Sequence, residues 1–273
     1  MPSTQSSKIA RFRDLHGAPG AFVIANAWDA GTARLLAGLG FPAIATSSGA
    51  CAGSLGRRDG EVSRDEALAH ARVIVEATDL PVSADLEKGF GDTPADVSET
   101  VRLAVGIGLA GCSIEDATGD AGHPLYEAAY AAERIAAAAE AARSSRTGFV
   151  LTGRTENFLR GNPDLDDTIR RLQAFEAAGA DVLMAPGLPT LEAVRAVCSA
   201  VSKPVNFMAG IKGKSFTVAE LAAAGVKRVS LATSLYRAAM TAMVSAAREV
   251  QQTGTFTYLD TSLTASEQNS LMT

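Results

Sequence analysis

The sequence predicts one (β/α)8 barrel of the TIM type over residues 1–273, with a helical C-terminal extension from about residue 233. An Ala- and Leu-rich helical run, a glycine and a short β-prone run follow one another several times along the chain. The expected strands are separated by about 20 to 40 residues, enough for the crossover helix that parallel strands require. They are apolar without strict alternation, which is typical of a sheet covered on both faces.

Three local signals predict the eight strands. In four units, at 36–46, 103–115, 175–184 and 221–231, a helical run ends at a glycine and a strand comes next. The four glycines stand where a left-handed residue closes the last helical turn. Two further strands begin after a proline, at 81–85 and 204–208, and apolar runs at 21–27 and 148–153 supply the remaining two.

Two segments between or after the strands are expected to be helical or mobile. The Ala-rich stretch 127–143 carries charges with the spacing of an exposed helical face, so it predicts a helix of the outer ring. From Gly254 onward the chain is polar apart from Phe256, Tyr258 and Leu259. This tail is either a helix that packs on a neighbouring subunit or a mobile end.

Composition excludes several classes of protein. The 25 Lys and Arg residues are outnumbered by 30 Asp and Glu, and a net charge of −5 disfavours nucleic-acid binding. Cys51, Cys112 and Cys198 are too far apart for a disulfide framework or a structural zinc site. No apolar run spans a bilayer and no apolar core marks a secretory signal, so we expect a cytoplasmic protein without membrane partners.

One glycine-rich motif is interpreted as a turn. The run Gly-Ile-Gly-Leu-Ala-Gly at 106–111 matches the GxGxxG pattern of dinucleotide-binding proteins. It follows a helix and precedes a strand, which is the reverse of the order needed to bind phosphate at a helix N-terminus. We therefore expect it to join a helix to a strand of the barrel.

Polar side chains gather at the carboxyl ends of the strands, where such barrels form their active sites. Asp85 and Glu87 end the third strand, Glu115 the fourth and Arg154 the fifth, and Asn206 lies on the seventh. Facing carboxylates repel one another unless a cation lies between them. Oxygen ligands without His or Cys favour Mg²⁺ or Mn²⁺, so Asp85, Glu87 and Glu115 are the predicted metal ligands.

The face of the barrel at the carboxyl ends of the strands, which we call its mouth, is also expected to bind a small 2-oxo acid. Arg154 offers a fork of N–H donors for a carboxylate. Ser47, Ser48 and Gly49, after the second strand, can donate hydroxyl and backbone hydrogen bonds to the same anion. His123 lies in the loop after the fourth strand, and both a catalytic and a structural interpretation of it stay open.

Five segments resemble the isocitrate lyase/phosphoenolpyruvate mutase superfamily, and the likeness extends from about residue 15 to residue 247. The resemblance implies a barrel, a homodimer or homotetramer that exchanges its last helix between subunits, and a Mg²⁺ ion that holds a pyruvate-like enolate. The segments are Ser-Ser-Gly at 47–49, Gly-Arg-Arg-Asp at 56–59, Ala-Asp-Leu-Glu-Lys-Gly-Phe-Gly at 84–91, Ser-Ile-Glu-Asp at 113–116 and Gly-Arg-Thr-Glu at 153–156.

The resemblance also implies roles for individual residues. It puts Asp85 directly on the metal, with Glu87 and Glu115 near it, often through water. It makes Asp59 a further metal-shell or catalytic-loop residue, so that Arg154, Asp59 and His123 are the catalytic candidates. The residues expected around the substrate are Ser47, Ser48, Gly49, Arg154 and Asn206.

The mobile loop after the fourth strand departs from the superfamily pattern. Isocitrate and methylisocitrate lyases carry Lys-x-Cys-Gly-His there, whereas this chain has Gly-Asp-Ala-Gly-His at 119–123. The acidic residue that lyases carry after strand six is replaced in Met-Ala-Pro-Gly at 184–187, and the Lys-x-Asn loop of the mutases is absent. If a loop acid is needed, His123 and Tyr126 are the candidates.

Three functions are therefore weighed. The first is C–C cleavage or decarboxylation of a small 2-oxo or 2-hydroxy dicarboxylic acid through a pyruvate enolate. The second is phosphonomutase or phosphonopyruvate hydrolase chemistry on a C–P bond. The third is binding of a 2-oxo acid without catalysis.

Overall fold

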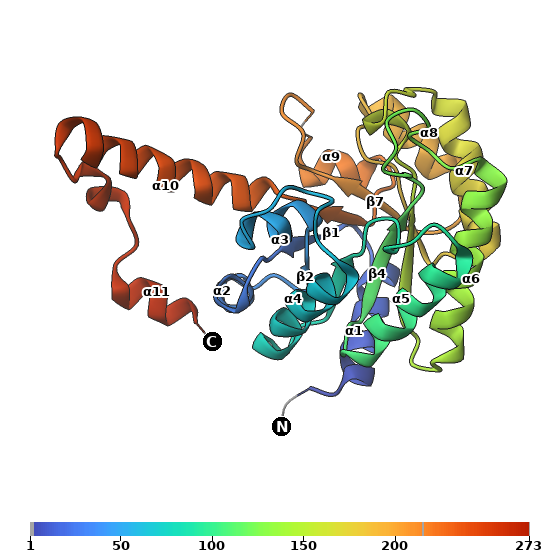
Figure 1. Cartoon of the computed structure of the whole chain (residues 1–273), viewed down its shortest axis with the longest axis horizontal. Helices are drawn as coiled ribbons and strands as arrows, with labels where there is room; N and C mark the ends of the chain where they lie inside the picture. The colour runs from blue at the N-terminus through green and yellow to red at the C-terminus, as the bar shows by residue number, and fades with distance from the viewer. Residues whose placement is uncertain (1–2, 215, 273) are drawn as a thin grey trace.

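The computed structural model describes residues 3–214 and 216–272 and has a closed barrel of eight parallel strands at its centre (Figure 1). Each strand pairs with its neighbours in chain order, and β1 closes the ring by pairing with β8. The prediction of a (β/α)8 barrel is confirmed. The strands are β1 (Phe22–Asn26), β2 (Ile44–Ala45), β3 (Val82–Asp85), β4 (Gly111–Glu115), β5 (Val150–Arg154), β6 (Val182–Met184), β7 (Val205–Met208) and β8 (Arg228–Ser230).

Helices surround the barrel and their apolar faces pack on its outer side (Figure 1). The expected Ala-rich helix is α6. The helices are α1 (Gln5–Gly17), α2 (Ala30–Gly38), α3 (Ser48–Ser54), α4 (Arg64–Ala77), α5 (Pro94–Gly106), α6 (Ala128–Ser144), α7 (Leu165–Ala178), α8 (Leu191–Ala200), α9 (Val218–Ala223), α10 (Ser234–Thr253) and α11 (Ala265–Leu271), with 3₁₀ turns η1 (Asn157–Leu159) and η2 (Thr257–Thr261).

The amino end of the barrel is closed by α1. Ile9 and Phe12 of this helix are fully buried and pack against Ile24, Val150 and Val182 of the strands. Since α1 fills this end with buried side chains, a site open to solvent has room only at the opposite end, where the strands end.

Glycines close the helix-to-strand turns as predicted. Gly40, Gly108, Gly179 and Gly225 have φ of 85°, 92°, 105° and 99°, in the left-handed region that glycine tolerates best. The GxGxxG run is such a turn, because α5 ends at Gly106 and β4 begins at Gly111.

The two outer glycines of this run give a matched test of packing at β4. A Cβ on Gly111 would lie 2.5 Å from the Val150 carbonyl oxygen of β5, whereas a Cβ on Gly106 would meet no heavy atom within 4 Å. We expect Gly111→Ala to lower the free energy of unfolding by about 2 kcal/mol, because the strands must move apart. Gly106→Ala is the control and should leave it unchanged or raise it by up to about 1 kcal/mol. Equal urea-denaturation curves for the two variants would contradict the close approach.

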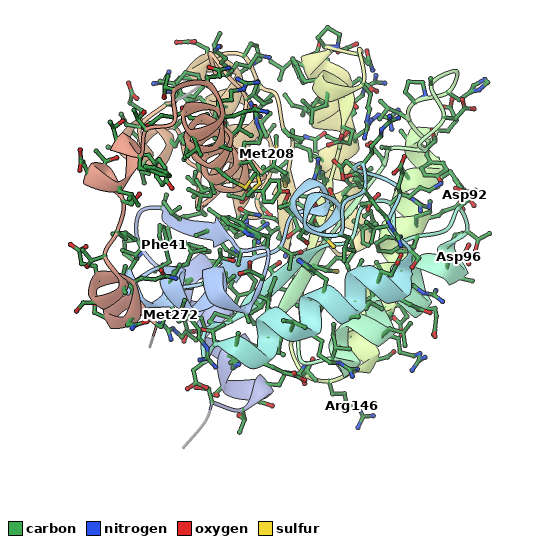
Figure 2. The ribbon with its side chains drawn as sticks, turned by 60° about the vertical axis from the view of Figure 1, so that its left-hand side comes forward. Phe41, Asp92, Asp96, Arg146, Met208 and Met272 are labelled. Carbon is green, nitrogen blue, oxygen red and sulfur yellow. The ribbon has the colours of Figure 1, made fainter. Side chains whose placement is uncertain are left out.

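The C-terminal extension is helical. The helix α10 projects away from the barrel, and the chain then turns back so that α11 lies beside α2 (Figure 1). A Cβ on Gly38 of α2 would lie 2.2 Å from the Leu271 carbonyl oxygen, and Met272 is on the same side of the molecule as Phe41 (Figure 2). Exchange of this extension between subunits stays a prediction. Within the described residues, no helix combines the length and the hydrophobicity needed to cross a membrane.

Candidate active site

The alternation of side chains along β3, β4 and β5 positions the site. In β5, Val150 packs in the core inside the barrel and Leu151 faces the helices. Side chains alternate along a strand, so residues two positions apart face the same way. Arg154 therefore points inward at the end of β5. The parallel register then brings it beside Glu115, its direct partner on β4.

Arg154 lies among three carboxylates. Its Nε donates a hydrogen bond to Glu156 Oε1 at 2.6 Å, and the same nitrogen is 3.4 Å from Glu115 Oε2. Its Nη1 is 3.7 Å from Asp85 Oδ1. Burial by itself lowers the pKa of Arg154, but the three carboxylates outweigh it and raise the pKa above its ordinary value. The side chain is only 12% exposed, so a permanent cation is fixed at the mouth of the barrel.

Glu156 is a site residue that the sequence reasoning did not single out. Its side chain is 1% exposed and holds Arg154 from the turn after β5. The signal was present in the Gly-Arg-Thr-Glu segment, two residues beyond the arginine. Asp116 orients this turn, since it accepts hydrogen bonds from the Glu156 backbone N–H and the Thr155 hydroxyl, each at 2.8 Å.

Two of the predicted metal ligands have raised pKa values, and burial is the main cause in both. Burial, together with the charges of Asp85 and Asp59, raises the pKa of Glu87 to about 7. Burial also raises the pKa of Glu115; Arg154 opposes this, while Glu156 and Asp85 add to it. Glu87 has a φ of 49°, a left-handed conformation that costs a non-glycine residue energy and is common at functional sites.

The segment after β2 lies against the same carboxylates. The Ser48 backbone N–H donates to Asp85 Oδ2 at 3.3 Å, and Ser47 is the buried residue that precedes α3. A Cβ on Gly49 would lie 2.8 Å from Thr233 Cγ2 and 3.2 Å from Asp59 Oδ2. The absence of a side chain at Gly49 is thus what lets the Asp59 loop approach α3.

A cavity of about 570 Å³ opens at this end of the barrel, and we call it the mouth cavity. A narrower cavity of about 50 Å³ lies inside the barrel, and Arg154 lines both while Asp85 lines the inner one. The mouth cavity therefore brings together half of the predicted site residues, namely Ser48, Asp59, Glu87, Glu115 and Arg154. Its lining comprises Ser48, Asp59, Gly60, Glu61, Glu87, Lys88, Glu115, Ala117, Thr118, Gly119, Arg154 and Arg160.

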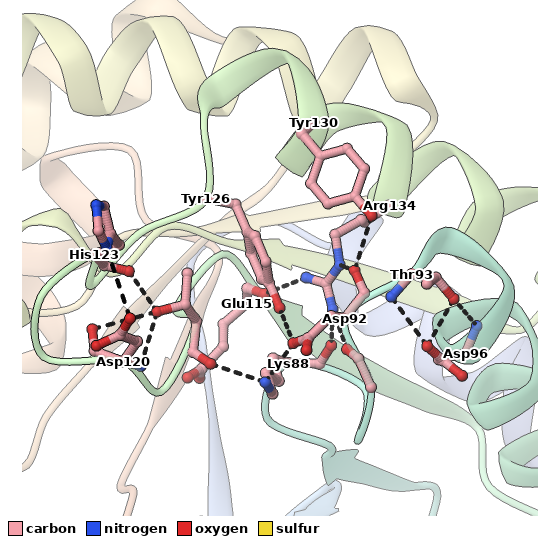
Figure 3. A network of polar contacts seen from close by, with 12 residues as sticks. Lys88, Asp92, Thr93, Asp96, Glu115, Asp120, His123, Tyr126, Tyr130 and Arg134 are labelled. Atoms are coloured by element: carbon pink, nitrogen blue, oxygen red, sulfur yellow. Dashed lines mark hydrogen bonds and ion pairs between the residues drawn. The ribbon is translucent and has the colours of Figure 1, made fainter.

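The predicted site residues that do not line the mouth cavity are Ser47, Gly49, Asp85, Asn206 and His123. Asp85 lines the inner cavity, and Ser47 and Gly49 flank Ser48 in the sequence. The Asn206 amide is buried inside the barrel, where its Oδ1 accepts from Arg228 Nε at 2.8 Å and its Nδ2 donates to Ser230 Oγ at 3.0 Å. His123 projects from the loop after β4, with a side chain 88% exposed and Nδ1 3.6 Å from Asp120 Oδ2 (Figure 3). A substrate contact for Asn206 and a catalytic role for His123 stay predictions.

A buried arginine holds the loop that follows Glu87 (Figure 3). Arg134 of α6 donates to the backbone carbonyls of Lys88, Gly91, Asp92 and Glu115. Its guanidinium carbon lies 4.2 Å from the centre of the Tyr126 ring. The expectation that the charges of this helix are exposed is wrong for Arg134, which is 1% exposed, because its partners come from distant segments.

The donor chemistry fits a hard divalent ion, although the side chains do not form a finished cage. In residues 3–214 and 216–272, no group of three His, Cys, Asp or Glu side chains is positioned to hold a metal as it stands. Asp85, Glu87 and Glu115 nevertheless offer only oxygen atoms around one mouth, where burial and then the charges of Asp85 and Asp59 raise the pKa of Glu87. Mg²⁺ usually retains several waters and needs few direct protein ligands, so this set fits it.

Comparison with known proteins decides the family. The family model for phosphoenolpyruvate phosphomutase matches residues 12–251. The chain belongs to the phosphoenolpyruvate phosphomutase family. This family is part of the isocitrate lyase/phosphoenolpyruvate mutase superfamily, so the resemblance seen in the sequence is confirmed, and the chain is an enzyme.

Relatives of this phosphomutase-family enzyme include lyases. It is 30% identical to 2,3-dimethylmalate lyase of Eubacterium barkeri over 272 residues, or 96% of this chain and 93% of the relative. It is 32% identical to oxaloacetate decarboxylase of Bradyrhizobium diazoefficiens over 206 residues, or 73% and 70% of the two chains. A solved structure from Burkholderia cenocepacia J2315, provisionally assigned as a lyase/mutase, matches with a TM-score of 0.95 and 51% identity over 97% of this chain and 96% of that one.

Proposed function

We propose that this enzyme decarboxylates a small 2-oxo dicarboxylic acid through a pyruvate-enolate intermediate, or cleaves a C–C bond in a small 2-hydroxy dicarboxylic acid. The observation that carries the proposal is the position of Arg154, a buried cation between two cavities and beside Asp85, Glu115 and Glu156. The relatives that are named as acting on dimethylmalate and oxaloacetate support this substrate class.

The residues at the mouth divide the work between binding and charge stabilisation. Arg154 binds the carboxylate next to the 2-oxo group, because its guanidinium lines both cavities. Ser47, Ser48 and Gly49 provide further donors beside it. Asp85, Glu87 and Glu115 are the side chains that would hold Mg²⁺ or Mn²⁺. When bound there, the ion neutralises negative charge that develops on the oxygens of a 2-oxo acid.

Proton transfer is assigned to the loops around the cavity. Asp59 lines the mouth cavity with Glu87, and its charge helps to raise the pKa of Glu87, so the two groups lie close enough to interact. We propose Asp59 as a catalytic-loop residue. The Tyr126 hydroxyl donates a hydrogen bond to Asp92 Oδ1 at 2.5 Å. The proton that Tyr126 would have to give to a substrate is therefore already engaged, which makes Tyr126 a weaker candidate for the loop acid.

The first test measures pyruvate release from oxaloacetate and from 2,3-dimethylmalate with and without Mg²⁺. Asp85→Asn keeps the size of the side chain but removes its charge, and we expect it to lower the Mg²⁺-dependent rate by about 100-fold. Asp14→Asn on α1, an exposed acid at the closed end of the barrel, is the control and should leave the rate unchanged. Undiminished turnover of the Asp85 variant would discard the proposal.

Phosphonate chemistry remains the second candidate, because the matching family model is named for a phosphomutase. The same preparation incubated with phosphonopyruvate and followed by phosphorus NMR tests it. Loss of the C–P signal without C–C cleavage of the dicarboxylates would favour this candidate over the first.

We also propose that the enzyme works as a homodimer or homotetramer. The helix α10 has no buried residue and exposes Met243, Val244 and Val250, which is unfavourable for an isolated subunit.

A further inference from the structure

A second arginine stands at the rim of the mouth cavity. Arg160 follows η1, lines the cavity, and has a side chain that is 44% exposed. Neither the predicted ligand set nor the predicted substrate contacts include it.

Arg160 and Arg154 are held by the same two carboxylates. Glu156 presents Oε1 to Arg154 Nε at 2.6 Å and Oε2 to Arg160 Nε at 3.3 Å. Glu115 presents Oε2 to Arg154 Nε at 3.4 Å and Oε1 to Arg160 Nη2 at 3.7 Å. Each carboxylate thus faces both guanidinium groups, which fixes one cation deep in the mouth and another nearer to solvent.

The cations that line the mouth cavity are Lys88, Arg154 and Arg160, and they differ in how many of their N–H donors are already used. Lys88 Nζ already donates to Asp92 Oδ1 at 2.6 Å and to the Thr118 carbonyl oxygen at 2.8 Å. Arg154 donates to Glu156. Within the part of the chain that the structure describes, the Arg160 guanidinium makes ion pairs but no hydrogen bond, so its N–H groups are available to a ligand in the cavity.

A role in charge balance alone explains Arg160 less well. Glu156 already has Arg154 as its close partner, and the contacts of Arg160 are 3.3 and 3.7 Å. The Arg160 side chain is 44% exposed, so solvent screens its attraction to these two buried carboxylates. A planar fork of donors that faces a cavity is instead suited to a second acidic group of a ligand.

We propose that Arg160 selects substrates that carry a distal acidic group, a carboxylate or a phosphonate, at the end opposite to the 2-oxo acid. This inference rests on the proposed function, since it takes Arg154 as the site of the first carboxylate. Arg154 and Arg160 then bind the two ends of a short dianion, and a monoacid engages only the deeper arginine.

Oxaloacetate and 2-oxobutyrate test the selection, because they differ only in a distal carboxylate or methyl group. Affinities of both are measured by calorimetry in Mg²⁺ for the wild type and for Arg160→Gln, with KM in place of affinity for any ligand that turns over. We expect binding of oxaloacetate to weaken about 10-fold, which corresponds to 1.4 kcal/mol, and binding of 2-oxobutyrate to change less than about 2-fold. Phosphonopyruvate in the same titration shows which distal acid depends more on Arg160.

Two further variants distinguish a role of Arg160 in substrate selection from a purely structural role. Arg160→Lys keeps a charge at the rim and should recover part of the preference for oxaloacetate. Arg102→Gln removes an exposed arginine that is paired with Glu99 on α5, and should leave both affinities unchanged.

The pattern of results distinguishes this inference from the proposed function. Equal weakening of both ligands by Arg160→Gln, or no change in either, would overturn the role of Arg160 while leaving Mg²⁺-dependent turnover intact. Selective weakening of oxaloacetate in a protein that turns over none of the substrates would support Arg160 and refute the proposed reaction. Failure of the wild type to bind any of these 2-oxo acids would overturn both.

Discussion

Arg154→Ala is expected to lower the rate of pyruvate release by about 1000-fold, the upper range for the loss of one preorganised donor at a developing negative charge. The reason is geometric. Arg154 is the cation that lines both cavities, and Asp85 and Glu115 lie within 4 Å of its guanidinium. Without it, the substrate carboxylate next to the 2-oxo group would lose the cation proposed to bind it and would lie beside Asp85 and Glu115. Arg154→Lys should recover only a small part of the rate, because an ammonium group cannot replace the planar fork.

The same substitution is expected to destabilise the fold. Glu156 is 1% exposed, and its only contact shorter than 3 Å with a cation in the described residues is to Arg154. Removal of one partner of a buried ion pair costs about 3–5 kcal/mol. Urea denaturation and pyruvate release, measured on the same preparations, separate the two effects.

Arg195→Ala on α8 is the matched control for Arg154→Ala. Its exposed guanidinium is paired with Glu192 at 3.6 Å, so both stability and rate should be unchanged. A variant of Arg154 with full activity would remove the proposed substrate site, whereas a variant that is inactive yet as stable as the wild type would contradict the buried ion pair.

The fold and the charged residues at the strand ends could be predicted from local sequence patterns. Glycines after helices and prolines before strands identify βα units, and a parallel barrel gathers the ends of all its strands at one face. This is why Asp85, Glu87, Glu115 and Arg154, which are distant in sequence, could be assigned to one site. Such reasoning needs only the strand ends and not the direction of individual side chains.

Residues beyond the strand ends were harder to place, because their positions depend on partners elsewhere in the chain. Glu156 and Arg160 belong to the site only because the turn after β5 folds back over Arg154. Asn206 is on the expected strand, but Arg228 and Ser230 engage its amide inside the barrel. The contacts of Asn206 with Arg228 and Ser230 have no local sequence signature.

Arg134 shows the same limit and leads to the second large prediction. Spacing on an Ala-rich helix cannot distinguish an exposed arginine from one that reaches the loop 88–92. We expect Arg134→Met, which keeps an unbranched apolar stem but no hydrogen-bond donor, to lower the free energy of unfolding by about 4 kcal/mol. The estimate takes about 1 kcal/mol for each of the four lost hydrogen bonds to backbone carbonyls. Urea denaturation measures it, and Arg143→Met, an exposed position on the same helix, should change stability by less than about 0.5 kcal/mol.

Loss of Arg134 should also reach the chemistry, because the carbonyls that it holds follow Glu87 and end β4 at Glu115. Groups that orient ligand side chains typically contribute 10- to 100-fold, so we expect the folded fraction of Arg134→Met to release pyruvate about 10-fold more slowly. Arg134→Lys keeps the charge but cannot reach four carbonyls with one ammonium group. Its stability and its rate should both fall between those of the wild type and those of Arg134→Met. If Arg134→Met unfolds at the same urea concentration as the Arg143→Met control, the network in Figure 3 does not hold the loop. If it is destabilised but fully active, the loop is held for the fold alone and not for Glu87.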